Sequence, residues 1–246
     1  MKDTVADRYA RFLALARELH DLGGVMGLLE WDQEVVMPAR GTSGRARQRA
    51  TLAALHHDKI VDGELGALVA ELAAADLEPW AAANVRELKR HRDRAVKLPR
   101  ELVADLAREG SLAQEAWADA RARDDFAAFR PWLEKNITLA QRYAEALGYE
   151  DRLYDALLDE FEPGETTAHV AASFEPLRDA LVDLLRRIRD ADDVATDLHS
   201  GSCPAAAQPS FATRGATEVG FDVEHGRHDT TAHPFSVGFA PSDVRI

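Results

Sequence analysis

The sequence predicts a mainly α-helical protein: a multi-helix body with a small C-terminal appendage, a β-hairpin or short strands. Through the first three quarters of the chain, apolar residues recur at three- and four-residue spacing, as on one face of a helix. After residue 190 the composition becomes small and polar, and from Phe221 short apolar runs separated by glycine and proline indicate strands. We therefore expect a helical body over 1–190, a loop with a weak helix over 191–220, and a short-strand appendage over 221–246.

The first predicted helix carries a clear apolar face. Apolar residues from Tyr9 to Leu29 follow the helical period, which is typical of an amphipathic helix. We expect Gly23 and Gly24 to weaken or bend this helix, and Pro38 to end the segment.

The later helices are bounded by residues that favour helix ends. Thr42 or Ser43 is suited to cap the second helix. Pro99 suits a first turn, because its missing N–H would have no partner there, and Gly148 favours the left-handed conformation that closes a helix. The predicted helices after the first cover residues 42–57, 62–74, a segment from 79, 99–123, 126–147, 152–161, 166–190 and 209–219.

Charge and composition restrict the function classes. The formal net charge is −13, from 43 acidic and 30 basic residues, and nucleic-acid binding requires a basic footprint instead. Cys203 is the one cysteine, so no internal disulfide can form, which fits a reducing compartment. No stretch resembles a signal peptide or reaches the roughly 18 apolar residues of a membrane span. We expect a cytoplasmic protein that binds neither nucleic acid nor membrane.

The nine histidines do not show the spacing of a hydrolytic zinc site. No H-E-x-x-H, which places two histidines on one face of a helix, occurs in the chain. The nearest cluster is His225, His228 and His233, where the turn at Gly226-Arg227 can bring two imidazoles together. We interpret these side chains as polar turn residues on a solvated hairpin and expect no metal in the chain. A metal site at the three histidines is the alternative.

Several passages in order along the chain resemble one peptidase family. LLEWDQEVVMP at 28–38 looks like a characteristic W-D-Q-E-x-x-M-P passage, and KLPRELVADLA continues the match. Near the end, His233–Phe235 forms an H-P-F signature, and Asp243–Ile246 forms the first four residues of D-x-R-x-T. These passages resemble the carboxypeptidase Taq family, cytoplasmic zinc metallocarboxypeptidases with a mostly helical fold, and the resemblance covers essentially the whole chain.

The resemblance implies that this chain corresponds to the N-terminal half of such a peptidase. Family members are about twice as long, and H-E-x-x-H, which supplies two zinc ligands and the general base, follows soon after D-x-R-x-T. Zinc therefore belongs to the full-length members, and the resemblance assigns no catalytic residue to this chain. It does imply vestigial substrate-binding residues, which are His233, Pro234, Phe235, Asp243 and Arg245.

Two functional hypotheses follow from the resemblance. The first is a truncated family member that is catalytically inactive alone and acts as an interaction or regulatory module. The second is part of an active zinc-dependent carboxypeptidase, which releases C-terminal amino acids once the zinc-binding half is supplied in trans or by a longer chain. Family members are dimers, so the expected partner is a second copy of the chain. A full-length paralogue or a complementary fragment is the further possibility.

Overall fold

The computed structural model describes three stretches of the chain, residues 4–191, 201–202 and 204–246. The described residues divide into two compact units. One unit contains the chain up to Leu147 together with Glu224–Ile246, and the other contains Gly148–Val223. Cys203 lies outside the described residues.

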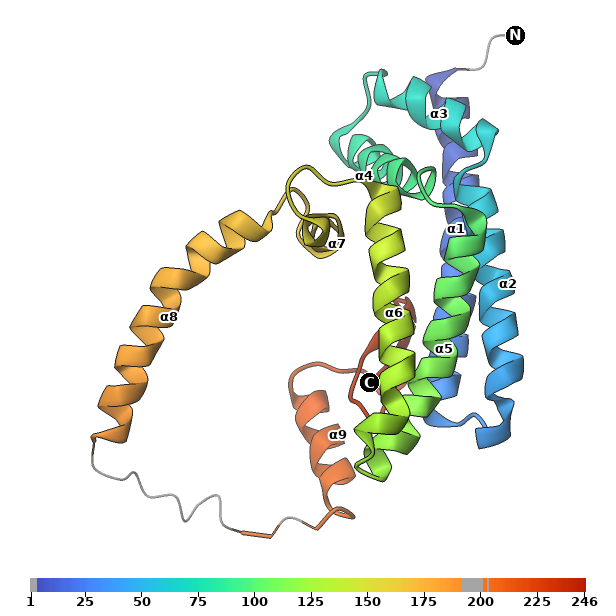
Figure 1. Ribbon diagram of the computed structural model, residues 1–246. Coiled ribbons are helices and arrows are strands. Elements are labelled where there is room, and N and C mark those ends of the chain that lie inside the picture. Colours follow the sequence, from blue (N-terminus) through green and yellow to red (C-terminus); the bar gives the residue numbers. More distant parts are fainter. Residues whose placement is uncertain (1–3, 192–200, 203) are drawn as a thin grey trace. The chain divides into compact units, whose positions relative to one another are not determined.

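Figure 1 shows that the described chain is mainly helical, with short strands only near its C-terminal end, which confirms the predicted fold class. In the described residues, no helix combines the length and apolar character needed to cross a bilayer. The helices of the first unit are α1 (Val5–Val35), η1 (Ala39–Gly41), α2 (Thr42–Ile60), α3 (Gly63–Ala73), α4 (Pro79–Ala95), α5 (Arg100–Ala122) and α6 (Phe126–Leu147). Those of the second unit are α7 (Leu153–Phe161), α8 (Thr167–Arg189) and α9 (Gln208–Glu218).

Helix α1 begins with a capping box. Thr4 Oγ1 accepts a hydrogen bond from the backbone N–H of Asp7 at 3.1 Å, and Asp7 Oδ2 accepts one from the backbone N–H of Thr4 at 3.0 Å. The helix then continues without interruption through Gly23 and Gly24 to Val35. The two glycines do not end it, because packing of an apolar face contributes more to helix stability than propensity does.

Helix α2 starts differently from the sequence-based expectation that Thr42 or Ser43 caps it. The cap is Gly41, and Thr42 is the first helical residue. Thr42 Oγ1 instead donates to the carbonyl oxygen of Ala39 at 3.4 Å, within the preceding 3-10 helix. By contrast Thr166 does cap α8, since its hydroxyl accepts from the N–H of His169 at 3.2 Å.

The main hydrophobic core lies among helices α1 to α4. Large apolar side chains from each of these helices are almost completely buried there, and removing such area from water is the dominant stabilising term in folding. The buried members are Phe12, Leu19, Ile60, Leu65, Val69, Leu72 and Val85.

Helices α5 and α6 are joined by a buried carboxylate. Glu109 is 6% exposed, and its Oε2 lies 2.6 Å from the ammonium group of Lys135 on α6. Arg108 Nε donates to the other carboxylate oxygen at 3.2 Å. A buried charge is costly unless opposite charges and hydrogen bonds compensate it. The ion pair with Lys135 therefore favours the observed alignment of α5 with α6, while Arg108, on α5 itself, adds a second compensating charge.

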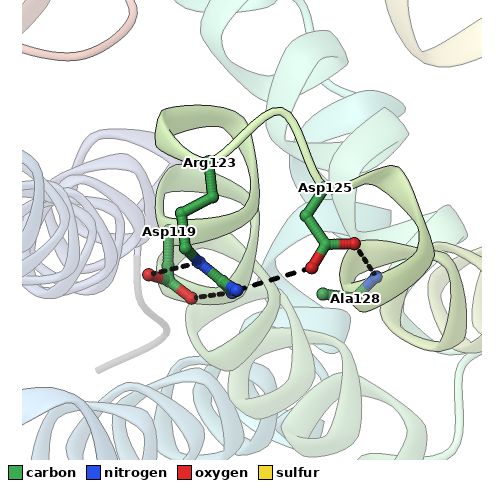
Figure 2. A network of polar contacts seen from close by, with 4 residues as sticks. All are labelled: Asp119, Arg123, Asp125 and Ala128. Atoms are coloured by element: carbon green, nitrogen blue, oxygen red, sulfur yellow. Dashed lines mark hydrogen bonds and ion pairs between the residues drawn. The ribbon is translucent and has the colours of Figure 1, made fainter.

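The turn between α5 and α6 is held by the polar network drawn in Figure 2. Arg123 Nη2 lies 2.5 Å from Asp119 on α5, and Nη1 lies 3.4 Å from Asp125. Asp125 Oδ1 also accepts from the N–H of Ala128 at 3.0 Å, in the first turn of α6. Between them Asp124 adopts φ 54°, a left-handed conformation that aspartate tolerates better than most residues. The chain can therefore reverse direction within a few residues.

The three short strands form one sheet in the order β1-β3-β2 and belong to the first unit. The central strand β3 (Asp243–Arg245) pairs in parallel with β1 (Gly226–Arg227) and antiparallel with β2 (Val237–Ala240). Backbone hydrogen bonds of 3.0 Å run from Val244 N to His225 O and from Ile246 N to Arg227 O. The strand that ends the chain is thus paired on both edges.

The sheet packs closely on α1 at a glycine. A Cβ atom on Gly27 would lie 3.1 Å from Phe239 Cε1 and 3.6 Å from Val237 Cγ2, whereas one on Gly23, a turn earlier, would have no neighbour within 4 Å. Gly27 is therefore the position at which the absence of a side chain lets β2 approach the helix.

We expect Gly27→Leu to lower the free energy of unfolding by about 1–3 kcal/mol, because the new side chain forces Phe239 away from α1. Gly23→Leu is the matched control on the same helix. It should raise stability by up to about 1 kcal/mol, because leucine is the better helix former and nothing crowds its Cβ. Urea unfolding followed by circular dichroism measures both. Equal effects of the two substitutions would contradict the close packing at Gly27.

Candidate functional site

The candidate site surrounds the last turn of α1, where residues 31–34 read W-D-Q-E. Asp32 lies 2.5 Å from Arg45 Nη2 of α2, and Arg45 Nη1 also donates to the carbonyl oxygen of Leu29 at 2.5 Å. The Arg45 side chain is only 12% exposed, so this pair is shielded from bulk water. It ties the end of α1 to α2.

The next two side chains tie α1 to α5. Gln33 Nε2 donates to the backbone oxygen of Ser111 at 2.7 Å, and the Ser111 hydroxyl donates back to Gln33 Oε1 at 2.6 Å. Ser111 is completely buried, so this reciprocal pair satisfies groups that have no access to water. One turn further along α5, Gln114 Nε2 donates to Glu34 Oε2 at 2.7 Å.

Trp31 connects α1 to the sheet. Its side chain is buried, and two guanidinium groups from the sheet lie over its ring. The Arg245 Cζ atom is 4.8 Å from the ring centroid, and the Arg227 Cζ atom is 5.2 Å from it. Arg245 also lies 5.7 Å from the ring of Phe239. Cation–π contacts of this kind are stronger where the cation is shielded from water.

Arg245 is held rigidly by these contacts and by its neighbour on β3. Its Nε atom donates to Asp243 Oδ1 at 2.7 Å, and its side chain is 17% exposed. The hydrogen bond to Asp243 uses the Nε atom. The two terminal amino groups remain as a planar fork, a geometry that suits a carboxylate.

The H-P-F loop is fixed against α5. The ring of His233 meets the ring of Trp117 edge-on, with centroids 6.3 Å apart. Arg121 Nη1 donates to the carbonyl oxygen of Ala232 at 2.7 Å, while the Arg121 guanidinium lies over Trp117 at 5.1 Å. The backbone before His233 and its imidazole are thus both tied to one face of α5.

Glu34 is a partly buried acid on this surface. Burial raises its pKa above the ordinary value, while the hydrogen bond from Gln114 lowers it in part. Acids whose pKa is raised in this way occur often at functional sites.

An open pocket of about 300 Å³ adjoins the H-P-F loop at Trp117. Its walls are the aromatic rings of Trp117, Phe126 and Phe129, with Arg121 and Asp125 beside them. It lies where α5 turns into α6, beside the network of Figure 2. Pockets with mostly apolar walls and a few polar groups are common ligand sites.

The structure brings two of the expected site residues, Arg245 and His233, against helices α1 and α5. Arg245 pairs with Asp243 and lies over Trp31 of α1. His233 lies against Trp117 of α5, one turn beyond the Gln114 that pairs with Glu34. Pro234 is exposed and Phe235 is half-buried in the same loop. Their roles in substrate binding stay predictions.

The alternative metal site gains no support from the arrangement of histidines. Within the described part of the chain, no three histidine, cysteine, aspartate or glutamate side chains gather as metal ligands, His225, His228 and His233 included. A catalytic zinc needs three protein ligands held in place. The side chains in the described part of the chain therefore do not fit a catalytic zinc.

Sequence reasoning missed the partners of the W-D-Q-E turn. Ser111 and Gln114 lie about eighty residues further along the chain than their partners, so no local pattern connects them. Trp117 and Arg121 follow on α5 at helical spacing, and the sequence analysis did not identify them as site residues either. One sequence feature could have indicated that these side chains have buried partners. The polar run Asp32–Glu34 ends a helix whose other turns carry apolar residues.

The sequence matches one family of metallopeptidases over most of its length. Residues 11–246 match the carboxypeptidase Taq (M32) metallopeptidase family. The chain therefore belongs to this family, and the family identified from its sequence passages is confirmed.

Among the relatives, thermostable carboxypeptidase 1 of Thermus thermophilus is 36% identical over 97% of this chain and 49% of its own length. Thermostable carboxypeptidase 1 of Pyrococcus furiosus is 35% identical, over 96% of this chain and 48% of that protein. The chain thus spans about half the length of the curated relatives it matches.

Solved structures agree with this alignment. The crystal structure of BsuCP superposes with a TM-score of 0.92 at 26% identity, over 97% of this chain and 48% of that one. A structure of Pyrococcus furiosus carboxypeptidase gives a TM-score of 0.81 at 34% identity, over 97% and 49% of the two chains. The described fold is therefore shared with one half of longer peptidases.

Proposed function

We propose that this chain supplies the substrate-positioning half of a zinc metallocarboxypeptidase and releases no amino acid until a zinc-bearing half completes the site. On its own it acts as an interaction module whose partner is that half. The observation that carries the proposal is the position of Arg245, held over Trp31 and paired with Asp243.

Arg245 has the properties of a clamp for a peptide C-terminus. A carboxypeptidase must recognise the terminal carboxylate, and the planar guanidinium fork pairs with a carboxylate in a bidentate geometry. Burial of the stem and the ring contacts fix the fork before substrate arrives, so little conformational entropy is lost on binding. The positive charge is also shielded from water, which strengthens its attraction to an anion.

The H-P-F loop supports the same role. His233 lies against Trp117, one turn of α5 beyond the Gln114 that pairs with Glu34. Polar groups and an aromatic ring therefore accompany the carboxylate clamp on the same two helices, α1 and α5. Such groups can orient a peptide by hydrogen bonds and apolar contact. They provide binding and orientation, and the sequence contains no H-E-x-x-H to accompany them.

Zinc, where another half supplies it, would polarise the scissile carbonyl and lower the pKa of a bound water to about 7. This chain contributes to that reaction by holding the substrate. On this proposal the isolated chain can bind a peptide C-terminus but does not cleave the peptide.

Reconstitution tests the proposal. The chain is mixed or co-expressed with the part of Thermus thermophilus carboxypeptidase 1 that lies beyond its matched segment, and zinc is added. We expect release of the C-terminal residue from an N-acylated dipeptide by the pair and none by either part alone. Robust zinc- or cobalt-dependent turnover by the 246-residue chain alone would refute the proposal.

A further inference from the structure

One face of α5 holds two parts of the candidate site that come from distant segments of the chain. At 100° per residue, Ser111, Gln114, Trp117 and Arg121 fall within an arc of about 120° around the helix. Ser111 and Gln114 bind the W-D-Q-E turn of α1, while Trp117 and Arg121 bind the H-P-F loop. The same helix therefore sets the positions of both segments.

The H-P-F loop depends on such contacts because it has no regular backbone structure. Residues 230–236 lie between β1 and β2 and belong to no helix or strand. Ala232, His233 and Pro234 are all exposed. An exposed connection of this kind keeps one conformation where contacts from a rigid element tie it down.

Arg121 and Trp117 hold the loop in different ways. Arg121 Nη1 donates to the carbonyl oxygen of Ala232 at 2.7 Å, a charge-assisted hydrogen bond that fixes the backbone just before His233. Trp117 meets the imidazole with the two ring planes at 82°, a favoured edge-on arrangement that fixes the orientation of the ring. The Arg121 guanidinium also lies over the Trp117 ring, so each of the two residues supports the other.

We propose that Trp117 and Arg121 are positioning residues, which hold His233 in the orientation that binds the peptide and touch no substrate themselves. The inference rests on the proposed function, in which His233 and Arg245 bind the same peptide. Arg245 lies over Trp31, in the turn that α5 also holds. Because α5 fixes both segments, the imidazole and the carboxylate clamp keep their relative position before substrate arrives, which reduces the entropy lost on binding.

Nuclear magnetic resonance of the isolated chain tests the structural part of the inference. The ring-proton resonances of His233 are assigned by their loss in His233→Gln. They are then compared among Trp117→Leu, Arg121→Gln and Arg123→Gln. Arg123 is the matched control at the end of the same helix, because its guanidinium binds carboxylates of the turn between α5 and α6 (Figure 2).

We expect Trp117→Leu and Arg121→Gln to shift and broaden the His233 resonances, because the imidazole loses either the ring beside it or the anchor before it. Arg123→Gln should leave these resonances in place, and circular dichroism should show the helical content of the parent in all three variants. His233 resonances that stay unchanged in both test variants would overturn the inference.

Kinetics of the reconstituted peptidase separate positioning of His233 from a general structural effect. Each test variant should raise KM about tenfold, the usual effect of losing one charge-assisted or ring contact, and change kcat less than about twofold. Trp117→Phe, which keeps an aromatic ring, should restore most of the parent KM. A KM in Trp117→Phe as high as in Trp117→Leu would contradict orientation of the imidazole by the ring.

A double-mutant cycle shows whether Trp117 acts through His233. In the His233→Ala background, Trp117→Leu should raise KM less than about twofold, because the group that it positions is already gone. An increase as large as in the parent would overturn the inference. Absence of activity in the reconstituted parent would remove the proposed function alone, and the His233 resonances would still decide whether α5 orients the imidazole.

Discussion

Replacing Trp31 with alanine is expected to lower the free energy of unfolding by about 3–5 kcal/mol, the usual cost of removing a buried tryptophan. The substitution leaves a cavity at the end of α1 and removes the ring over which Arg227 and Arg245 lie. The sheet should therefore loosen before the helices do. Chemical unfolding followed by circular dichroism gives the free energy, and limited proteolysis within residues 224–246 reports the loosening.

Trp80→Ala is the matched control. Trp80 is 62% exposed and meets Tyr9 edge-on at 5.7 Å, so its loss should cost about 1 kcal/mol and leave the sheet intact. If Trp31→Ala unfolds at the same denaturant concentration as Trp80→Ala, Trp31 does not organise the site.

The second large effect concerns Arg245 in the reconstituted peptidase. We expect Arg245→Gln to reduce kcat/KM about 100-fold, because losing a shielded ionic contact to the substrate carboxylate costs about 3 kcal/mol. The reduction should fall mainly on KM, since the carboxylate is bound equally in the ground and transition states. Steady-state kinetics on N-acylated dipeptides measure both constants.

Arg227→Gln provides the control for Arg245. Arg227 lies over the same ring, but its side chain is 52% exposed and pairs with Asp229 at 2.5 Å. Its replacement should change kcat/KM by less than about threefold, since exposed ion pairs contribute at most about 1 kcal/mol. A peptide whose C-terminus is amidated should bind equally to the parent and to Arg245→Gln. A clear preference of the parent for the amide would contradict the carboxylate clamp.

The helices could be predicted from the sequence because the patterns that indicate them span only a few neighbouring residues. The apolar period, Thr166 as a cap and Gly148 at φ 81° after α6 each act within a few residues. The cap of α2 was predicted one residue too late, because Gly41 ends a 3-10 turn that runs directly into α2 and that no simple sequence pattern indicates.

The site was less predictable because its contacts join distant segments. The resemblance pointed to Arg245 and His233, yet not to the rings that hold them, Trp31 and Trp117. Parallel pairing of β1 with β3 was also hidden, because strands of two and three residues carry almost no periodic signal. Such pairings depend on the packing of the whole unit.

The central claim is that this chain positions the substrate while a second half binds the metal. The zinc content of the purified chain tests this claim most directly. Elemental analysis is made after dialysis against zinc and then against buffer, for the chain alone and for its complex with the second half. We expect no stoichiometric zinc on the chain alone and one tightly bound ion per complex. One tightly bound zinc per isolated chain, lost in His228→Ala, would contradict the account.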